Sequence, residues 1–222
     1  MFAGHIGAAL AIGRVEPRVN VGVFVLAALF LDAVLWLFVL LGWESVVIPA
    51  NFARTHQPVF VFPYSHGLLA AVAWSLVAGI ATAAWYPKLG AARWRAAVFV
   101  GLAVFSHWLL DALVHAPGLP LAAQGSGKVG LGLWNDMPVA LAVEALVAAA
   151  GLWLFVSAAD LSRGRKVWLA LLTGVALAFT IVGMTVAPAP PSVAVMAASS
   201  LVTLVIVCVL AGWAGWAGRR SS

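Results

Sequence analysis

The chain has 222 residues, of which 64% are hydrophobic and only 9% are charged, and its mean hydropathy is +1.08. Because about a quarter of the residues of a soluble domain are charged, this composition excludes a soluble globular protein. It indicates an integral membrane protein with a single transmembrane domain, residues 1–222. The net charge of +5 does not indicate a nucleic-acid partner, because the basic residues flank apolar segments in small groups.

The first apolar stretch, residues 2–13, is too short to cross a bilayer at about 1.5 Å per residue. It ends at a polar turn that contains Arg14 and Arg18. We expect a half-helix of about three turns that dips part-way into the bundle. The stretch lacks a basic leader and a cleavage site, so we do not expect a removable signal peptide.

Six apolar segments of spanning length follow, which predicts an all-α membrane bundle of six transmembrane helices plus the half-helix. A proline at position 63 favours a helix that begins there. Acids and histidines within the spans all precede residue 145, so a polar site region, 1–145, is followed by apolar helices five and six at 166–218. The six segments are residues 20–42, 63–85, 94–116, 137–159, 167–186 and 192–218.

The basic residues predict the orientation. If six spans alternate, ten of the twelve lysines and arginines fall on one side of the membrane, and only Arg54 and Lys128 fall on the other. The positive-inside rule assigns the first side to the cytoplasm. We therefore expect a multi-pass protein of a bacterial inner membrane with a cytoplasmic C-terminus.

The third span contains the segment FSHWLLDALVH, in which His107 and Asp111 are four residues apart. On a helix this spacing places both side chains on one face, about one turn apart. An ionised aspartate in hydrocarbon costs about 3 kcal/mol or more and needs a partner or a wet cavity. A histidine and an aspartate on one face offer nitrogen and oxygen ligands to a divalent metal.

Other helices carry matching groups at a similar depth. At about 1.5 Å rise per residue, these side chains lie about 13–28 Å from the cytoplasmic end of their segments. We predict that five of them form a shared metal site and that Glu144 lies near it. His115, at a helix end, and His56, in a loop, are expected to be capping or solvated residues. The five predicted ligands are His5, Asp32, His66, His107 and Asp111.

Imidazole and carboxylate ligands without a thiolate suit zinc better than manganese or iron. Five ligands serve either one ion with an outer carboxylate or two ions. A bound zinc lowers the pKa of its water to about 7, and Glu144 or Asp32 would then accept a proton as the catalytic base. Two alternatives remain open: polar side chains that join helices by hydrogen bonds, and a neutral Glu144 bonded to a neighbouring helix.

The loop 124–136, QGSGKVGLGLWND, is rich in glycine but lacks the GxxxxGK[ST] spacing of a phosphate-binding loop. We interpret it as a lid over the mouth of the site. Trp134 is expected at the membrane interface, with Asn135 and Asp136 near the start of the fourth span.

Four short motifs carry a resemblance: GHIGAAL at residues 4–10, LFLDAVLW at 29–36, YSHGLL at 64–69 and SHWLLDAL at 106–113. Together they resemble the membrane-bound metal-dependent hydrolases, the LexA-binding, inner-membrane-associated group. The resemblance covers about residues 1–145 and implies the same five ligands. The chain departs from the family pattern at Gly4, where a threonine is usual, and at Asp32, where the family has two aspartates.

These observations lead to three hypotheses. The first is a membrane-embedded hydrolase with a zinc-like cofactor, whose partners are membrane lipids and whose substrate is a lipid-linked or headgroup-proximal ester or phosphoester near the outer leaflet. The second is a small transporter that moves metal ions or protons through the same His/Asp cluster. The third is a non-catalytic membrane scaffold.

Overall fold

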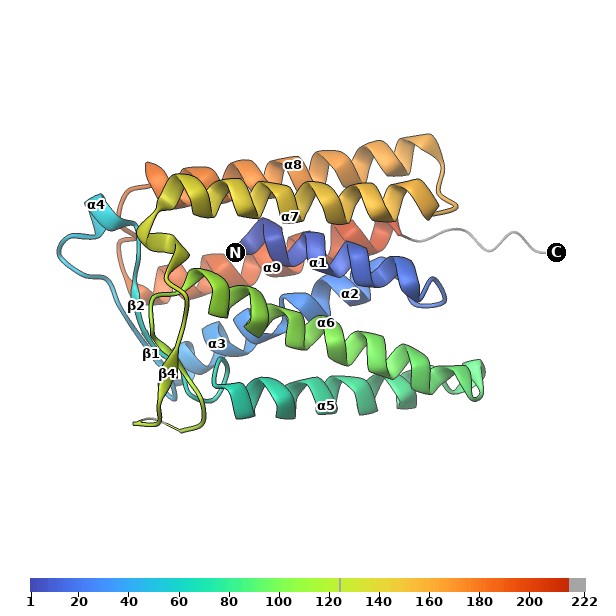
Figure 1. The fold of residues 1–222 in the computed structure, drawn as a ribbon, viewed down its shortest axis with the longest axis horizontal. Helices are drawn as coiled ribbons and strands as arrows, with labels where there is room; N and C mark the ends of the chain where they lie inside the picture. The colour runs from blue at the N-terminus through green and yellow to red at the C-terminus, as the bar shows by residue number, and fades with distance from the viewer. Residues whose placement is uncertain (124, 216–222) are drawn as a thin grey trace.

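The computed structural model describes residues 1–123 and 125–215 (Figure 1). The expectations for Gln124, for the end of the last span and for Arg219 and Arg220 lie outside these residues. The elements in chain order are α1 (Phe2–Val15), α2 (Val21–Ala28), α3 (Phe30–Leu41), β1 (Ser45–Val47), α4 (Phe52–Thr55), β2 (Val59–Val61), α5 (Leu68–Trp85), the 3₁₀ turn η1 (Pro87–Leu89), α6 (Ala92–Val114), β3 (Leu119–Pro120), β4 (Lys128–Val129), the 3₁₀ turn η2 (Leu133–Asn135), α7 (Met137–Ala158), α8 (Arg163–Thr185) and α9 (Val193–Ala214).

The protein is an all-α membrane helical bundle. Five helices, α5 to α9, are each long and apolar enough to cross a bilayer, and the pair α2–α3 makes a sixth span with a bend of 50°. Only 17% of the residues of α5 are buried within the protein, and the outward side chains include Leu76 and Ile80. Such a face is stable against lipid and unstable against water. The structure therefore confirms the predicted class, with six spans when the bent pair counts as one.

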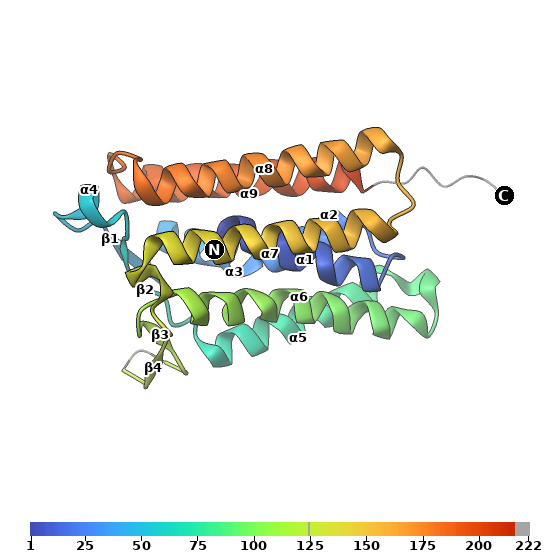
Figure 2. The same cartoon turned by 45° about the horizontal axis from the view of Figure 1, so that its top comes forward.

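The short helix α1 lies inside the bundle, where it packs against α7, α2 and α6 (Figures 1 and 2). Its close approach to α7 depends on glycine. A Cβ atom added at Gly151 would overlap the carbonyl of Gly7, and one added at Gly7 would overlap the backbone at Val147 and Ala148. Two backbones can approach this closely only where side chains are absent. This contact brings His5 into the interior.

The far end of α1 is fixed by a small ionic group. Arg18 Nε donates a hydrogen bond to Glu16 Oε1 at 2.6 Å, and Arg95 Nε lies 3.3 Å from Glu16 Oε2. The hydrogen bond from Arg18 lowers the pKa of the Glu16 carboxyl below its ordinary value. Since Arg95 belongs to α6, this group joins the end of α1 to the helix that carries His107 and Asp111.

The bend between α2 and α3 lies at Leu29. It places Asp32 in the first turn of α3, where free backbone N–H groups favour a negative charge. The span predicted at 20–42 therefore exists, but as two helices. The broken backbone lies within the protein beside polar side chains, which is where a membrane protein tolerates it.

The second predicted span begins later than expected. We expected a helix from Pro63, but α5 starts at Leu68, and residues 63–67 form a turn. Glu44 holds this turn by accepting hydrogen bonds from the backbone N–H groups of Tyr64 and Ser65, at 2.8 and 2.9 Å. A buried carboxylate that satisfies these donors competes with helix formation. His66 is consequently a turn residue.

The two ends of the bundle differ. The hairpins β1–β2 and β3–β4 lie at one end together with α4 (Figure 2). At this end lie only two of the ten described lysines and arginines, Arg54 and Lys128. The remaining eight lie at the other end, at Arg14, Arg18, Lys88, Arg93, Arg95, Arg163, Arg165 and Lys166.

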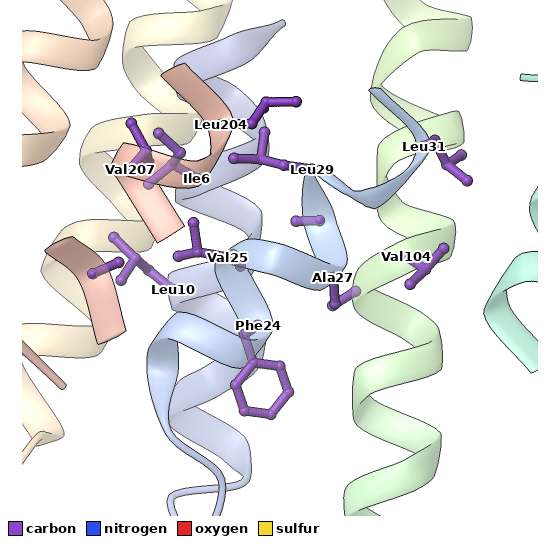
Figure 3. Close-up of a cluster of buried hydrophobic side chains, with 14 of the residues drawn as sticks. Ile6, Leu10, Phe24, Val25, Ala27, Leu29, Leu31, Val104, Leu204 and Val207 are labelled. Carbon is purple, nitrogen blue, oxygen red and sulfur yellow. The ribbon is translucent and has the colours of Figure 1, made fainter. Parts of the chain in front are cut away.

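A cluster of large apolar side chains fills the centre of the bundle (Figure 3). Ile6 and Leu10 of α1 and Phe24 and Val25 of α2 are almost completely buried in it. Within a bilayer such side chains stabilise the bundle through van der Waals packing, because lipid chains are as apolar as they are. Along α1 and α2 the cluster lies between the polar residues and the basic end of the molecule.

Candidate metal centre

The hydrogen bonds around His66 determine which of its ring nitrogens carries the hydrogen. Ser65 Oγ donates its single hydrogen to Glu44 Oε2 at 2.7 Å, and the same Oγ lies 2.8 Å from His66 Nδ1. Because the hydroxyl hydrogen is already used, Ser65 Oγ accepts the hydrogen bond and Nδ1 carries the proton. His66 Nε2 therefore presents a lone pair, as a metal-ligating imidazole does.

His107 is held in the same way from another direction. Its Nδ1 lies 2.7 Å from the carbonyl oxygen of Ala28, the last residue of α2. A carbonyl only accepts, so His107 Nδ1 is the donor and Nε2 is free. The bend that follows Ala28 thus supplies a contact that fixes the orientation of a histidine of α6.

The two free nitrogens face each other. His66 Nε2 and His107 Nε2 lie 3.2 Å apart, and both residues are buried. Two lone pairs at this distance repel, so the arrangement calls for a cation between them, either a proton or a metal ion. Asp111 and Asp32 provide negative charge at the same point.

Each of two carboxylates lies close enough to both nitrogens to complete a set of three ligand atoms. Asp111 Oδ2 lies 3.3 Å from His107 Nε2 and 3.6 Å from His66 Nε2. Asp32 Oδ1 lies 3.7 Å and 3.6 Å from the same two nitrogens. Ligand atoms around a tetrahedral zinc lie about 3.3–3.6 Å apart. The donor types and their separations therefore fit a divalent metal ion.

His5 belongs to the same cluster. Its ring stacks on the ring of His107 with centroids 3.8 Å apart, and its Nε2 lies 3.2 Å from Asp111 Oδ1. His5, Asp32 and His107 form a second group whose ligand atoms lie within 4.8 Å of one another, overlapping the group of His66, His107 and Asp111. Within the described part of the chain, His5 Nδ1 has no hydrogen-bond partner.

A small cavity of about 90 Å³ opens beside these groups. Its wall includes Asp32, His66 and Asp111, together with Trp134 from the loop before α7. This volume equals about three water molecules at their liquid volume. It is large enough to hold water or a small polar group.

Trp134 lines the cavity, and the interpretation of its loop as a lid stays a prediction. The ring of Trp134 packs against His115 with centroids 4.2 Å apart, and Gln57 donates a hydrogen bond to the Trp134 carbonyl at 3.2 Å. Asp136 caps α7 by accepting a hydrogen bond from the backbone of Val139. Trp134 is thus attached to the loop that contains Gln57 and to the end of α6.

Comparisons with family models, with curated proteins and with solved structures find no match. The resemblance to the metal-dependent hydrolase family stays a prediction. The geometry of the side chains therefore has to carry the functional argument.

Glu144 lies apart from the ligand atoms described above. Its Oε1 accepts hydrogen bonds from the backbone N–H groups of Ala3 and Gly4, at 2.8 and 3.3 Å. A carboxylate at this place satisfies donors that the first turn of α1 leaves free. Glu144 thereby anchors α1, which matches the predicted alternative of a contact with a neighbouring helix, and its role as a base stays a prediction.

Of the two histidines expected outside the ligand set, His115 caps the end of α6 as expected, and only His56 departs from the expectation. His115 is half-buried at the end of α6, and its Nε2 lies 3.8 Å from Asp111 Oδ2, so it borders the cluster. His56 was expected to be solvated, but it is buried behind Phe52, with ring centroids 5.8 Å apart. The tertiary contacts of the loop 43–62 override its polar sequence.

Glu44, Ser65 and the Ala28 carbonyl are the contributors that sequence reasoning missed. A serine directly before a predicted ligand and a lone acid in the facing loop are weak indications of such a contact. The contact with the Ala28 carbonyl could not be predicted, because every residue has a backbone carbonyl.

Proposed function

We propose that this protein is a membrane-embedded metal-dependent hydrolase that acts on an ester or phosphoester of a lipid. The observation that carries the proposal is the pair of Nε2 lone pairs of His66 and His107, which face each other between two carboxylates. In this arrangement both Nδ1 atoms are occupied by hydrogen bonds, so the ligands are oriented before an ion binds. We assign zinc as the ion, because nitrogen and oxygen donors at these separations suit it.

Each side chain of the site would have its own role in hydrolysis. His66, His107 and Asp111 would hold the ion, which when bound polarises the scissile group and makes a water more acidic. Asp32 is the least enclosed member, with a side chain 25% exposed, and it borders the cavity. It is the best-placed group to accept the proton of the attacking water. Trp134 and the lid would exclude bulk water.

Transport receives less support than hydrolysis. A permeation path needs polar groups on both sides of the cluster, yet Ile6, Leu10, Phe24 and Val25 close the route toward the basic end. Access from the loop-bearing end alone suits an enzyme that works at one face of the bilayer. A scaffold role does not explain why the Nε2 lone pairs of His66 and His107 face each other.

The first test is metal content and lipid turnover of the purified protein. We expect the protein to retain zinc and to hydrolyse a fluorogenic phospholipid or lipid ester in mixed micelles. A chelator should abolish the activity and zinc should restore it. Asp111→Asn should lose both zinc and activity, because it removes the charge between four histidines, whereas Asp160→Asn, at an exposed loop, should behave as the wild type.

Two results would overturn the proposal. A wild-type protein that retains no metal after reconstitution would favour the scaffold. Zinc uptake into proteoliposomes that depends on Asp111, without turnover of any lipid ester or phosphoester, would favour the transporter.

A further inference from the structure

A second, larger cavity adjoins the candidate metal centre. Its volume is about 430 Å³, within the range of about 300–1,000 Å³ that is typical of small-molecule sites. It shares five lining residues with the small polar cavity, so the two spaces meet along a common wall. The shared residues are Met1, Asp32, Trp36, Phe60 and Trp134.

The far wall of this cavity is formed by α8 and α9. Three hydroxyls there donate to backbone carbonyls of their own helix: Thr180 to Ala176, Ser199 to Met196 and Thr203 to Ser199. Their hydrogens are therefore already used within the wall, whereas Ser200, the fourth hydroxyl of the wall, makes no such bond among the described residues. Met184 and Met196 add flexible apolar surface that adapts to the shape of a ligand.

The charged side chains that border the cavity disfavour an anionic ligand. No lysine or arginine lines it among the residues that the structure describes. The carboxylate of Glu144 reaches it, but that group is held by the backbone of Ala3 and Gly4. An uncharged apolar group is the occupant that such a wall accepts at least cost.

The position of the cavity indicates where its ligand comes from. Along α9 its wall extends from Met196 to Leu204, about 12 Å at the helical rise per residue. Both helices are membrane spans, and Phe179 at the edge of the cavity is 57% exposed on the outer face of the bundle. The cavity therefore lies at the depth of lipid chains and borders them.

We infer that this cavity, here named the chain cavity, binds one hydrocarbon chain of a membrane lipid whose ester or phosphoester lies at the His/Asp cluster. The inference rests on the proposed function and specifies its substrate class. The polar cavity has room for the head of such a lipid but not for its chain. The common wall gives a single molecule access to both spaces.

A substitution at Gly183 can fill the chain cavity. It lies in the wall on α8, and a Cβ atom added there meets no atom within 4 Å. Gly183→Phe should therefore occupy the cavity without displacing the backbone. Gly174→Phe is the matched control, because Gly174 lies on the same helix, faces outward and also has open space around its Cβ position.

The experiment uses the full chain in nanodiscs and a long-chain alcohol that carries a diazirine at the end of its alkyl chain. We expect light-induced labels on residues 179–184 and 196–204 of the wild type and of Gly174→Phe. Labelling there should be lost in Gly183→Phe, while all three proteins retain the same zinc content. Ser200→Phe, on the facing helix, should give the same loss if Gly183→Phe fails to fold.

Labels that spread evenly over the lipid-facing helices, or that persist in both filled variants, would overturn the inference. Measured hydrolysis of two esters distinguishes failure of this inference from failure of the proposed function. The filled variants should lose turnover of a long-chain ester while they keep turnover of an acetyl ester. A wild type that is labelled at the chain cavity, yet holds no metal and hydrolyses neither ester, would overturn the proposed function and with it the assignment of that lipid as a substrate.

Discussion

The hydrogen atom on Nδ1 of His66 and of His107 decides what each ring can bind. Ser65 and the Ala28 carbonyl keep both hydrogens on the side away from the cluster. In metal proteins such outer contacts orient the ring and raise its basicity. Glu44 extends this control, because it fixes the hydroxyl of Ser65 as well as the backbone of the turn.

Removal of the Ser65 hydroxyl should therefore weaken metal binding without touching a ligand. In Ser65→Ala the ring of His66 loses its acceptor, and we expect the zinc affinity to fall about 10–100-fold. The measurement is a competition titration with a chromophoric zinc chelator.

Ser106→Ala is the control for this prediction. Ser106 is half-buried on α6 and donates only to the carbonyl of Ala103, within its own helix. Its removal should leave the zinc affinity unchanged. Equal affinities in Ser65→Ala and Ser106→Ala would show that the Ser65 contact does not orient His66.

At the scale of elements, the site depends on segments that are not regular spans. His5 comes from a helix too short to cross a bilayer, Asp32 from the turn after a bend and His66 from a turn before a helix. Each irregularity costs backbone hydrogen bonds, which the surrounding protein replaces. Only His107 and Asp111 lie on one long helix, as their spacing predicts.

The anchoring of α1 by Glu144 can be separated from a role as the catalytic base. Glu144→Gln keeps an oxygen acceptor, so as an anchor it should retain the zinc content and lose only about 0.3–1 kcal/mol of stability. Glu144→Ala leaves the N–H groups of Ala3 and Gly4 buried without their acceptor, at about 1–3 kcal/mol each. We expect it to melt earlier and to bind less zinc.

The two roles differ in turnover. If Glu144 is the base, Glu144→Gln should lower kcat about 10²–10⁴-fold at full zinc content. If it is only an anchor, kcat should stay near the wild-type value. Thermal unfolding, zinc content and kcat of both variants, measured side by side, distinguish them.

For the molecule as a whole, the basic end and the site-bearing end are opposite. We predict that the basic end, and with it the C-terminus, faces the cytoplasm. In a Cys208→Ala background, Ala53→Cys on α4 should react with a membrane-impermeant maleimide in intact cells. Ser162→Cys, before α8, should react only after the cells are opened; the reverse pattern would invert the topology.

The sequence predicted much of the architecture because membrane insertion depends on local composition. Apolar segments of about 20 residues identified α6 to α9 within a few residues, and the spacing of His107 and Asp111 placed both on one face. Prediction from the sequence was less successful where polar contacts hold the backbone in a turn instead of a helix. The start of α5 was wrong because Glu44, far away in the chain, holds the turn before it.

The amino-acid sequence by itself determined the class of the protein, its spans and the residue types available for a metal, since these follow from hydropathy and from the period of a helix. Only the tertiary structure decided that α1 enters the bundle, which nitrogen each histidine presents and that Glu144 holds the backbone of α1. Those features depend on contacts between residues far apart in the chain, such as Ser65 with Glu44 and Glu144 with Ala3. Local pattern does not encode such contacts, because they form only after the helices have packed.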